Sequence, residues 1–238
     1  MERVPGCWEH MSMVWEALID ARERKVDVAN IWLDIANAYG SLPHKLIFLA
    51  LERYGVPDKW IAIVKSYYLG LWSKSFSSTA PSSWHRHQRG IFAGCTLSII
   101  LFVAAMNLII EYILAANTPG FTTAGGVGLP PVRAFMDDLN LMAGSVPDAR
   151  TLLDRACVAL KWAGMEFRAD KSRSIVLKQG KSLRTTPFEI PNGDCIETIP
   201  SVQNKPIKFL GRVINGHLND RKSIDELKEK LESGLTAI

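Results

Sequence analysis

The sequence predicts an α+β fold, in which helices alternate with short strands that are bounded by turns. Apolar residues recur at helical spacing in several long segments, while other apolar runs are short and end at Gly, Pro, Asn or Asp. The composition is that of an ordinary globular chain, with 238 residues of which 47% are hydrophobic and 22% charged. Collagen-like, coiled-coil and disordered classes are therefore excluded. A chain of this length needs no disulfide or metal to fold.

The part of the chain up to residue 115 is predicted to be mainly helical. Helix stop signals, such as the glycine at 55 followed by a proline at 57, separate the periodic segments. The expected elements are a helix at 9–25, a strand at 28–35, helices at 44–55 and 58–70, short strands or a loop at 76–89, and a helix at 97–114.

The segment 97–114 is the nearest approach to a membrane span. It contains Asn107 and Glu111, and a charge at bilayer depth costs several kcal/mol. A helix in a protein core can instead turn both side chains toward a pocket or solvent. We therefore interpret the segment as a buried helix of a soluble protein, and no membrane partner is expected.

The second half of the chain is predicted to contain short strands around one amphipathic helix. Gly and Pro residues form a connection at 121–131, and two adjacent acids interrupt an otherwise strand-like segment at 132–144. The remaining expected elements are a helix at 149–164, strands at 174–177, 187–190 and 208–214, and a charged helix at 220–234.

Charge and cysteine usage restrict the setting of the protein. The formal net charge of +4 permits a polyanionic partner without requiring one. The four cysteines are scattered without a CxxC pair, and the N-terminus has no signal-peptide pattern, which indicates a reducing intracellular compartment. A zinc site made from Cys7, His10, His85 and His87 matches no standard spacing.

The strongest local signal is the pair Asp137–Asp138 between two apolar strand-like runs. Asp is common in tight turns, so one interpretation is a type I turn with no chemical role. Asp34 favours a second interpretation, because it lies in an apolar strand where an unpaired carboxylate would cost several kcal/mol. If the strands are neighbours, Asp34, Asp137 and Asp138 converge as an all-oxygen cluster. Such a cluster suits Mg²⁺ and phosphoryl transfer with two ions.

Five ordered segments resemble the motifs of reverse transcriptases of the non-LTR retrotransposon type. Residues 31–44 (IWLDIANAYGSLPH) resemble the first motif and residues 90–98 (GIFAGCTLS) the second. Phe135-Met136-Asp137-Asp138 is similar to the aromatic-x-Asp-Asp signature. The segment 162–172 resembles the fourth motif, and Lys208-Phe209-Leu210-Gly211 resembles the fifth. Each motif alone is weak, whereas the ordered set over about 28–214 is specific.

The resemblance implies a polymerase-type palm, an antiparallel sheet backed by helices, with partial fingers and a truncated thumb. Asp34 and Asp137 would bind two Mg²⁺ ions, with Mn²⁺ as a substitute, and Asp138 would assist or orient them. The carbonyl of Ile35 would contact the metal on the nucleotide side. Gly94 would let the backbone approach the nucleotide. Phe135, Lys208, Phe209, Leu210 and Gly211 would lie near primer and template.

Two residues keep alternative interpretations. Tyr39 falls where the family places an aromatic ring under the sugar, but ordinary core packing explains it equally well. Lys171 is a candidate general acid for the leaving pyrophosphate, and the alternative is a solvated surface lysine. The basic window 168–184 around it, which includes Arg173, could follow a phosphate backbone or simply be solvated.

The sequence also departs from the family pattern. Ala93 stands where the second motif usually has Gln, and Thr96 and Ile99 replace two usual prolines. We expect a fragment or decayed copy, organised as a helical remnant leading from the fingers (1–27), the palm with inserted finger and palm helices (28–214) and the start of a truncated thumb (215–238).

The resemblance implies an RNA-directed DNA polymerase that uses an RNA template, a DNA primer and dNTPs in a two-metal nucleotidyl transfer. The alternative is a catalytically silent palm that binds nucleic acid or a protein. Another palm enzyme, such as a nucleotide cyclase, is disfavoured because the second and fifth motifs have no use there. Nuclear residence is implied by the resemblance alone, and the oligomeric state is open.

Overall fold

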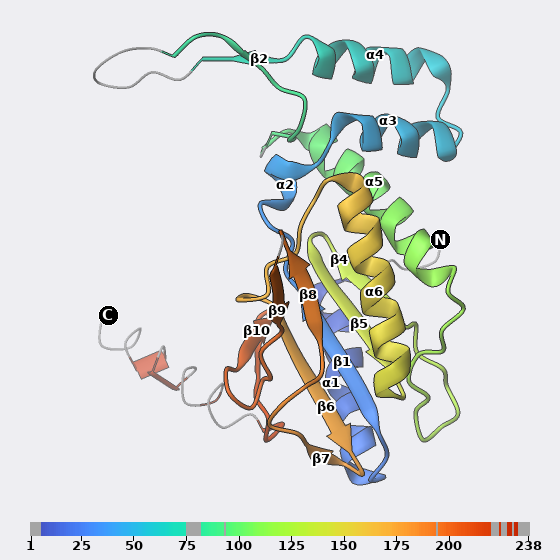
Figure 1. Cartoon of the computed structure of the whole chain (residues 1–238), viewed down its shortest axis with the longest axis vertical. Helices are drawn as coiled ribbons and strands as arrows, with labels where there is room; N and C mark the ends of the chain where they lie inside the picture. Colours follow the sequence, from blue (N-terminus) through green and yellow to red (C-terminus); the bar gives the residue numbers. More distant parts are fainter. Residues whose placement is uncertain are drawn as a thin grey trace.

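The centre of the protein is an antiparallel sheet with the strand order β4-β5-β1-β6-β7 (Figure 1). The computed structural model describes residues 6–74, 82–92, 94–193 and 195–219, and residues 224, 228, 229, 231 and 232. The strands of this sheet are β1 (Val28–Leu33), β4 (Val132–Phe135), β5 (Asp138–Ala143), β6 (Arg173–Lys178) and β7 (Lys181–Ser182).

The central strand β1 is buried on both faces, since all six of its residues are inaccessible to solvent. Successive side chains of a strand point to opposite faces. Ile31 accordingly lies in a core shared with the helices at one face, whereas Trp32 lies in a second core at the other face. The second core is closed by the helix α1 (Cys7–Glu23) and the hairpin of β10 (Ile207–Phe209) and β11 (Arg212–Ile214).

Helices cover the first face of the sheet and extend beyond it. In Figure 1, α5 and α6 lie beside the sheet, and α3 and α4 lie at the top of the view. These helices are α2 (Ala38–Ser41), α3 (His44–Arg53), α4 (Asp58–Leu69), α5 (Thr96–Leu114) and α6 (Val146–Ala163), and the remaining short strands are β2 (Trp72–Ser73), β3 (His85–Arg86), β8 (Glu189–Asn192) and β9 (Cys195–Thr198).

The helix α5 is buried on one face only, which corrects the interpretation of 97–114 as a buried helix. Leu101, Phe102 and Ile109 lie in the core, but Ile100 and Val103 are exposed. Within the described residues, α5 is the one helix that is long and apolar enough to cross a membrane by length and composition. Of its most apolar 18-residue stretch, 39% is buried. Its one-sided burial against α3 and α6 is also what a core helix shows.

The predicted α+β class is confirmed, and most predicted elements form within a few residues of their expected limits. The expected strand at 208–214 is instead the β10–β11 hairpin, because Leu210 (φ 46°) and Gly211 (φ 91°) turn the chain between its two strands. The short α2, β7 and β9 were not predicted. The predicted helix at 220–234 falls largely outside the described residues, and so does part of the segment 76–89. The division into domains remains a prediction.

Candidate active site

Asp34 is held at the point where β1 leaves the sheet. Its backbone N–H donates to the Ser172 hydroxyl at 3.1 Å, and its carbonyl accepts from the N–H of Arg168 at 2.9 Å. The Ser172 hydroxyl in turn donates to the Arg168 carbonyl at 2.7 Å. These bonds fix the backbone of Asp34 against the segment 168–172, so two segments far apart in the sequence set the position of its Cα atom.

Asp137 and Asp138 lie on the β4–β5 hairpin. Phe135 pairs with Asp138, so Met136 and Asp137 alone form the turn. Met136 has φ 57°, a left-handed value that a two-residue hairpin turn of the primed kind requires. A type I turn is therefore wrong for this site, because its first central residue would need a negative φ. Asp138 is the first residue of β5 and not a turn residue.

The sheet register brings Asp34 and Asp138 together. The last described pair between β1 and β5 is Leu33 with Leu139. Because the strands are antiparallel, the next position on each strand is Asp34 on one side and Asp138 on the other. Leu33 and Leu139 point into the core under the helices. Because successive side chains of a strand point to opposite faces, the adjacent Asp34 and Asp138 point to the other face.

The acids affect each other electrostatically. Burial and, to a smaller extent, the charges of Asp137 and Asp34 together raise the pKa of Asp138 to about 6. Burial also raises the pKa of Asp34, while the cations Lys171 and Arg168 oppose this and Asp137 adds to it. Carboxylates that crowd in this way disfavour their own charged form, which a bound cation would reverse.

A cleft of about 470 Å³ opens at Asp34 and Asp138, whereas Asp137, on the adjoining turn, does not line it. It lies between the ends of β1 and β5, the segment 170–173 and the β10 strand. Its lining residues are Trp32, Leu33, Asp34, Asp138, Leu139, Asp170, Lys171, Arg173, Lys205, Pro206, Ile207, Lys208 and Phe209. Lys171, Lys205 and Lys208 are exposed cations here, so the cleft combines acids at one end with positive charge along its walls.

Arg173 has a structural role that the sequence did not indicate. It is buried, and its guanidinium donates to the backbone carbonyls of Asp170, Ser172 and Lys205. Arg173 therefore ties the segment 170–172 to the chain before β10 and gives the cleft a fixed width. It is not available to follow a phosphate backbone, in contrast to the neighbouring Lys171.

Several predicted residues lie outside the lining of the cleft. Tyr39 is half-buried, and its ring contacts Phe102 edge-on with centroids 4.8 Å apart, so a packing role is present. Ile35 is buried in the core and forms a β-bridge with Phe167. Leu210 and Gly211 form the turn after β10, next to the cleft residue Phe209.

Phe135 lies at the end of β4, directly before the turn that carries Asp137, whereas Gly94 lies just before α5, which carries none of the three acids. Gly94 has φ 88°, and a Cβ built there would meet no atom within 4 Å, so the left-handed backbone and not lack of space favours glycine. The adjacent Ala93 lies outside the described residues. Phe135 is half-buried, and its ring is 6.1 Å from that of His10.

Arg133 is a buried cation that sequence reasoning missed. It is 5% exposed on β4, and its guanidinium has no hydrogen-bond partner in the part of the chain that the structure describes. Burial lowers its pKa to about 10. Its register partner is the buried Asn140, which bonds Asn30 at 3.0 Å. No pattern in the sequence distinguishes this arginine from a solvated one.

The donor set of the three aspartates suits a hard divalent cation, because all of its side-chain ligands are carboxylate oxygens. Among the described residues, no three His, Cys, Asp or Glu side chains are grouped closely enough to hold a metal ion as they stand. The observation that fits a cation is the raised pKa of Asp34 and of Asp138, which burial causes and neighbouring acids increase, because a bound cation would offset both effects. Cys7 and His10 on α1 and the two histidines of the β3 segment likewise form no such group.

Residues 5–214 match the family model described as reverse transcriptase (RNA-dependent DNA polymerase). The chain belongs to the reverse transcriptase family. The resemblance drawn from the five sequence motifs is confirmed, and the polymerase-type palm is the fold expected of this family.

Relatives of this reverse transcriptase chain are retrotransposable-element polyproteins. It is 28% identical over 190 residues to the retrovirus-related Pol polyprotein from type-2 retrotransposable element R2DM of Drosophila melanogaster, covering 77% of this chain and 17% of the relative. It is 29% identical over 196 residues to the retrovirus-related Pol polyprotein from type-1 retrotransposable element R2 of Popillia japonica. This match covers 78% of this chain and 26% of the relative. The chain thus spans about a sixth to a quarter of the length of these relatives.

A solved structure supports the fold. Apo telomerase from Candida tropicalis, truncated from the C-terminal domain, superposes with a TM-score of 0.57 at 11% identity. The match covers 89% of this chain and 40% of the telomerase chain. At this identity the likeness concerns the arrangement of the elements alone.

Proposed function

We propose that this chain catalyses RNA-templated DNA synthesis, by transfer of a nucleotide from a dNTP to a primer 3′-hydroxyl. The observation that carries the proposal is the position of Asp34 and Asp138 at matching ends of two paired strands, with Asp137 on the adjoining turn. Membership of the reverse transcriptase family supports the same chemistry. Two acids in a basic cleft, with a third on the adjoining turn, have no need in a purely structural scaffold.

Asp34, Asp137 and Asp138 would hold the divalent cations, with Mg²⁺ as the natural ion and Mn²⁺ as a substitute. When bound, two such ions would lower the pKa of the attacking hydroxyl and stabilise charge on the leaving pyrophosphate. The backbone bonds from Asp34 to Ser172 and Arg168 hold the main chain that carries this carboxylate. The three acid side chains would draw closer together around the ions, since they are not grouped as a chelating site among the described residues.

The remaining cleft residues act on the nucleic acid and the leaving group. Lys171, whose charge acts on Asp34, would donate a proton from Nζ to the pyrophosphate. Lys205 and Lys208 on the opposite wall would neutralise phosphates of the primer and template. Phe209 is buried against Trp32, with ring centroids 6.1 Å apart, and fixes β10 at the end of the cleft where the primer would lie.

Two further contacts would position the nucleotide. The left-handed backbone at Gly94 leaves open space above it, which a base or sugar can approach. Tyr39, on α2 directly after the Asp34 segment, would meet the sugar with the ring edge that Phe102 leaves free. RNA template, DNA primer and dNTPs are the partners that this arrangement requires.

Primer extension tests the proposal. The full chain is given an RNA template, a labelled DNA primer, dNTPs and either Mg²⁺ or Mn²⁺, beside Asp137→Asn. Asp154→Asn, an exposed acid on α6, is the matched control. Extension that disappears in Asp137→Asn and persists in Asp154→Asn is expected.

A catalytically silent palm is the second candidate. The observation that favours it is that the described acids are not grouped as a ready chelating site. Retained binding of the template–primer duplex, with no extension in either ion, would establish this alternative and overturn the enzymatic proposal.

A further inference from the structure

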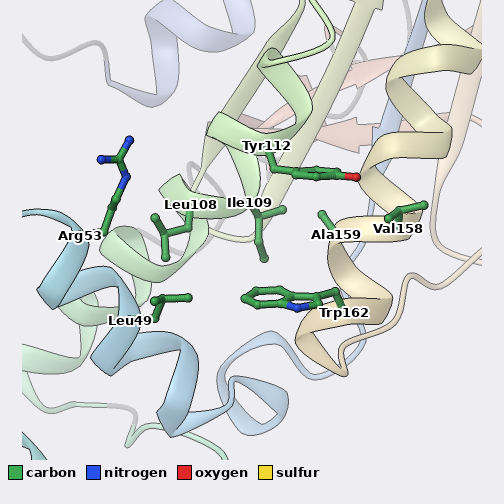
Figure 2. A pocket seen from close by; sticks show the side chains of 8 residues that line it. All are labelled: Leu49, Arg53, Leu108, Ile109, Tyr112, Val158, Ala159 and Trp162. Carbon is green, nitrogen blue, oxygen red and sulfur yellow. The ribbon is translucent and has the colours of Figure 1, made fainter.

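An apolar pocket of about 360 Å³ lies between α3, α5 and α6, apart from the cleft that holds the acids (Figure 2). This volume is at the lower end of the range for small-molecule sites. The pocket shares no lining residue with the cleft. Its lining residues are Leu49, Arg53, Leu108, Ile109, Tyr112, Val158, Ala159 and Trp162.

The pocket is a slot between two aromatic rings. Figure 2 shows the rings of Tyr112, from α5, and Trp162, from α6, edge-on and facing each other, with the buried Ile109 and Ala159 between them in this view. Leu108 and Ile109 form the side of the slot on α5, and Val158 lies at the α6 side. Stacking between two flat rings favours a flat aromatic guest.

One wall of the slot is braced. The guanidinium of Arg155 lies 4.2 Å from the centroid of the Tyr112 ring, and its Nε donates to the Tyr112 carbonyl at 3.0 Å. Arg155 is not a lining residue, so it supports Tyr112 from outside the slot. The opposite wall is exposed instead, because Trp162 is 68% accessible to solvent. A guest would therefore cover a large apolar surface without disturbing the core.

The charge at the slot is positive. Arg53 is the charged residue of the lining, and in Figure 2 its guanidinium lies beyond Leu49 and Leu108, at the end away from Val158. Within the described residues Arg53 has no hydrogen-bonded or ion-paired partner. The nearby acid Glu111 already accepts from the Tyr54 hydroxyl at 2.9 Å. A guest with an anionic group is favoured on these grounds.

We propose that this slot binds an unpaired nucleobase that carries a phosphate, with the base between Tyr112 and Trp162 and the phosphate at Arg53. The lining offers few polar groups, so the slot distinguishes bases poorly and recognises stacking and charge. A free nucleotide and one unit of a single-stranded nucleic acid share this chemistry. The site is separate from the catalytic cleft and does not depend on polymerase activity.

Photocrosslinking of the full chain with 8-azidoadenosine monophosphate tests the proposal, with the label mapped by peptide mass. Label is expected on the peptides that contain Tyr112 and Trp162. Trp162→Leu is expected to reduce labelling of the Tyr112 peptide by about fivefold or more, since a stacked base is worth about 1–3 kcal/mol. Trp60→Leu, another exposed tryptophan at 54% on α4, is the matched control and should leave labelling unchanged.

Unlabelled competitors of the photoprobe test whether the phosphate contributes to binding, and whether the guest is a free nucleotide or part of a strand. AMP should protect the slot better than adenosine, and Arg53→Met should remove that difference, whereas Lys45→Met on the same helix should not. Protection by AMP at concentrations as low as those of single-stranded oligoadenylate identifies a free nucleotide as a sufficient guest, and protection by oligoadenylate at much lower concentrations identifies a strand as the preferred one.

Equal labelling of the Tyr112 peptide in Trp162→Leu and wild type, or label only on cleft peptides that contain Lys171 or Lys208, would overturn the proposal. Label on cleft peptides alone would still agree with the proposed polymerase function, so the two failures are distinguishable.

Discussion

Asp34 and Asp138 occupy facing positions one residue beyond the Leu33–Leu139 pair that ends the β1–β5 ladder. The two acids come from segments more than a hundred residues apart in the sequence, and the register of one antiparallel pair brings them to the same face of the sheet. Placing two partly buried carboxylates so close together disfavours their charged forms, and the pKa of each acid is raised accordingly.

Asp138→Asn is expected to stabilise the fold at pH 7. The pKa of Asp138 rises from an ordinary 3.8 to about 6 on folding, so the folded state binds its proton more tightly. Its contribution to the free energy of unfolding therefore falls as the pH rises from about 4 to about 6, and remains low above that. Although neighbouring groups partly desolvate the carboxylate, the Asp138 side chain is also open to solvent at the cleft, so screening limits the gain to about 1 kcal/mol.

The measurement is urea unfolding of wild type and Asp138→Asn at pH 4 and pH 7, without divalent ions. The advantage of the variant should appear at pH 7 and vanish at pH 4. Asp154→Asn serves as the control. A variant that is less stable than wild type at pH 7 would contradict the account of crowded acids.

Arg133→Met is expected to raise the free energy of unfolding at pH 7 by about 2–3 kcal/mol. The guanidinium is buried without a hydrogen-bond partner in the described part of the chain, and its pKa is lowered to about 10. The penalty acts on the charged form, so it is fully present below pH 10. Replacing a buried charge by an apolar side chain of similar volume commonly stabilises a protein. Thermal unfolding beside Arg184→Met, an exposed arginine, measures the effect, and a lower midpoint for Arg133→Met would show that the guanidinium has a favourable partner.

Gly94→Ala is expected to destabilise the chain by about 1 kcal/mol, because φ 88° is unfavourable for a residue with a Cβ. The new methyl group meets no atom within 4 Å, so the effect reports backbone strain without a clash. Gly125→Ala is a matched control, since it also has open space but no left-handed φ. Chemical denaturation of both variants gives the comparison. Equal stability of the two would mean that Gly94 is not kept for its backbone conformation.

Lys171→Met and Lys171→Arg separate proton transfer from charge. If Nζ protonates the pyrophosphate, both variants should lose about 10²-fold or more in single-turnover nucleotide incorporation, because arginine keeps the charge but does not release a proton. Lys178→Met, on an exposed position of β6, is the control. Restoration of the rate by arginine would assign Lys171 to electrostatic support of Asp34 instead.

The site could be anticipated from sequence where a residue type conflicts with its surroundings. Asp34 stands out because an acid within an apolar strand needs a partner, and Asp137–Asp138 stand out between two apolar runs. The fold class followed from the alternation of helices and short strands. The pairing of β1 with both β5 and β6, which brings the acids together, depends on long-range register that no local pattern carries.

Other features arise only from tertiary contacts. The buried Arg173 donates to the backbone carbonyl of Lys205 at the cleft. Because every residue has a backbone carbonyl, the residue types do not predict this contact. The burial of Arg133 follows from the position of α1 across β4. The exposed face of α5 was missed because uniform apolarity shows that a helix is hydrophobic but does not show which side is covered.

The central claim is that the facing acids at the ends of β1 and β5 form a divalent-metal centre. Electron paramagnetic resonance titration of Mn²⁺ tests it most directly, with an RNA template, a dideoxy-terminated DNA primer and the next dNTP so that binding occurs without synthesis. Wild type and Asp154→Asn should bind Mn²⁺ in excess of that held by the nucleic acid and dNTP, and Asp34→Asn should lose this protein-dependent binding. Equal Mn²⁺ binding by Asp34→Asn and wild type would contradict the claim.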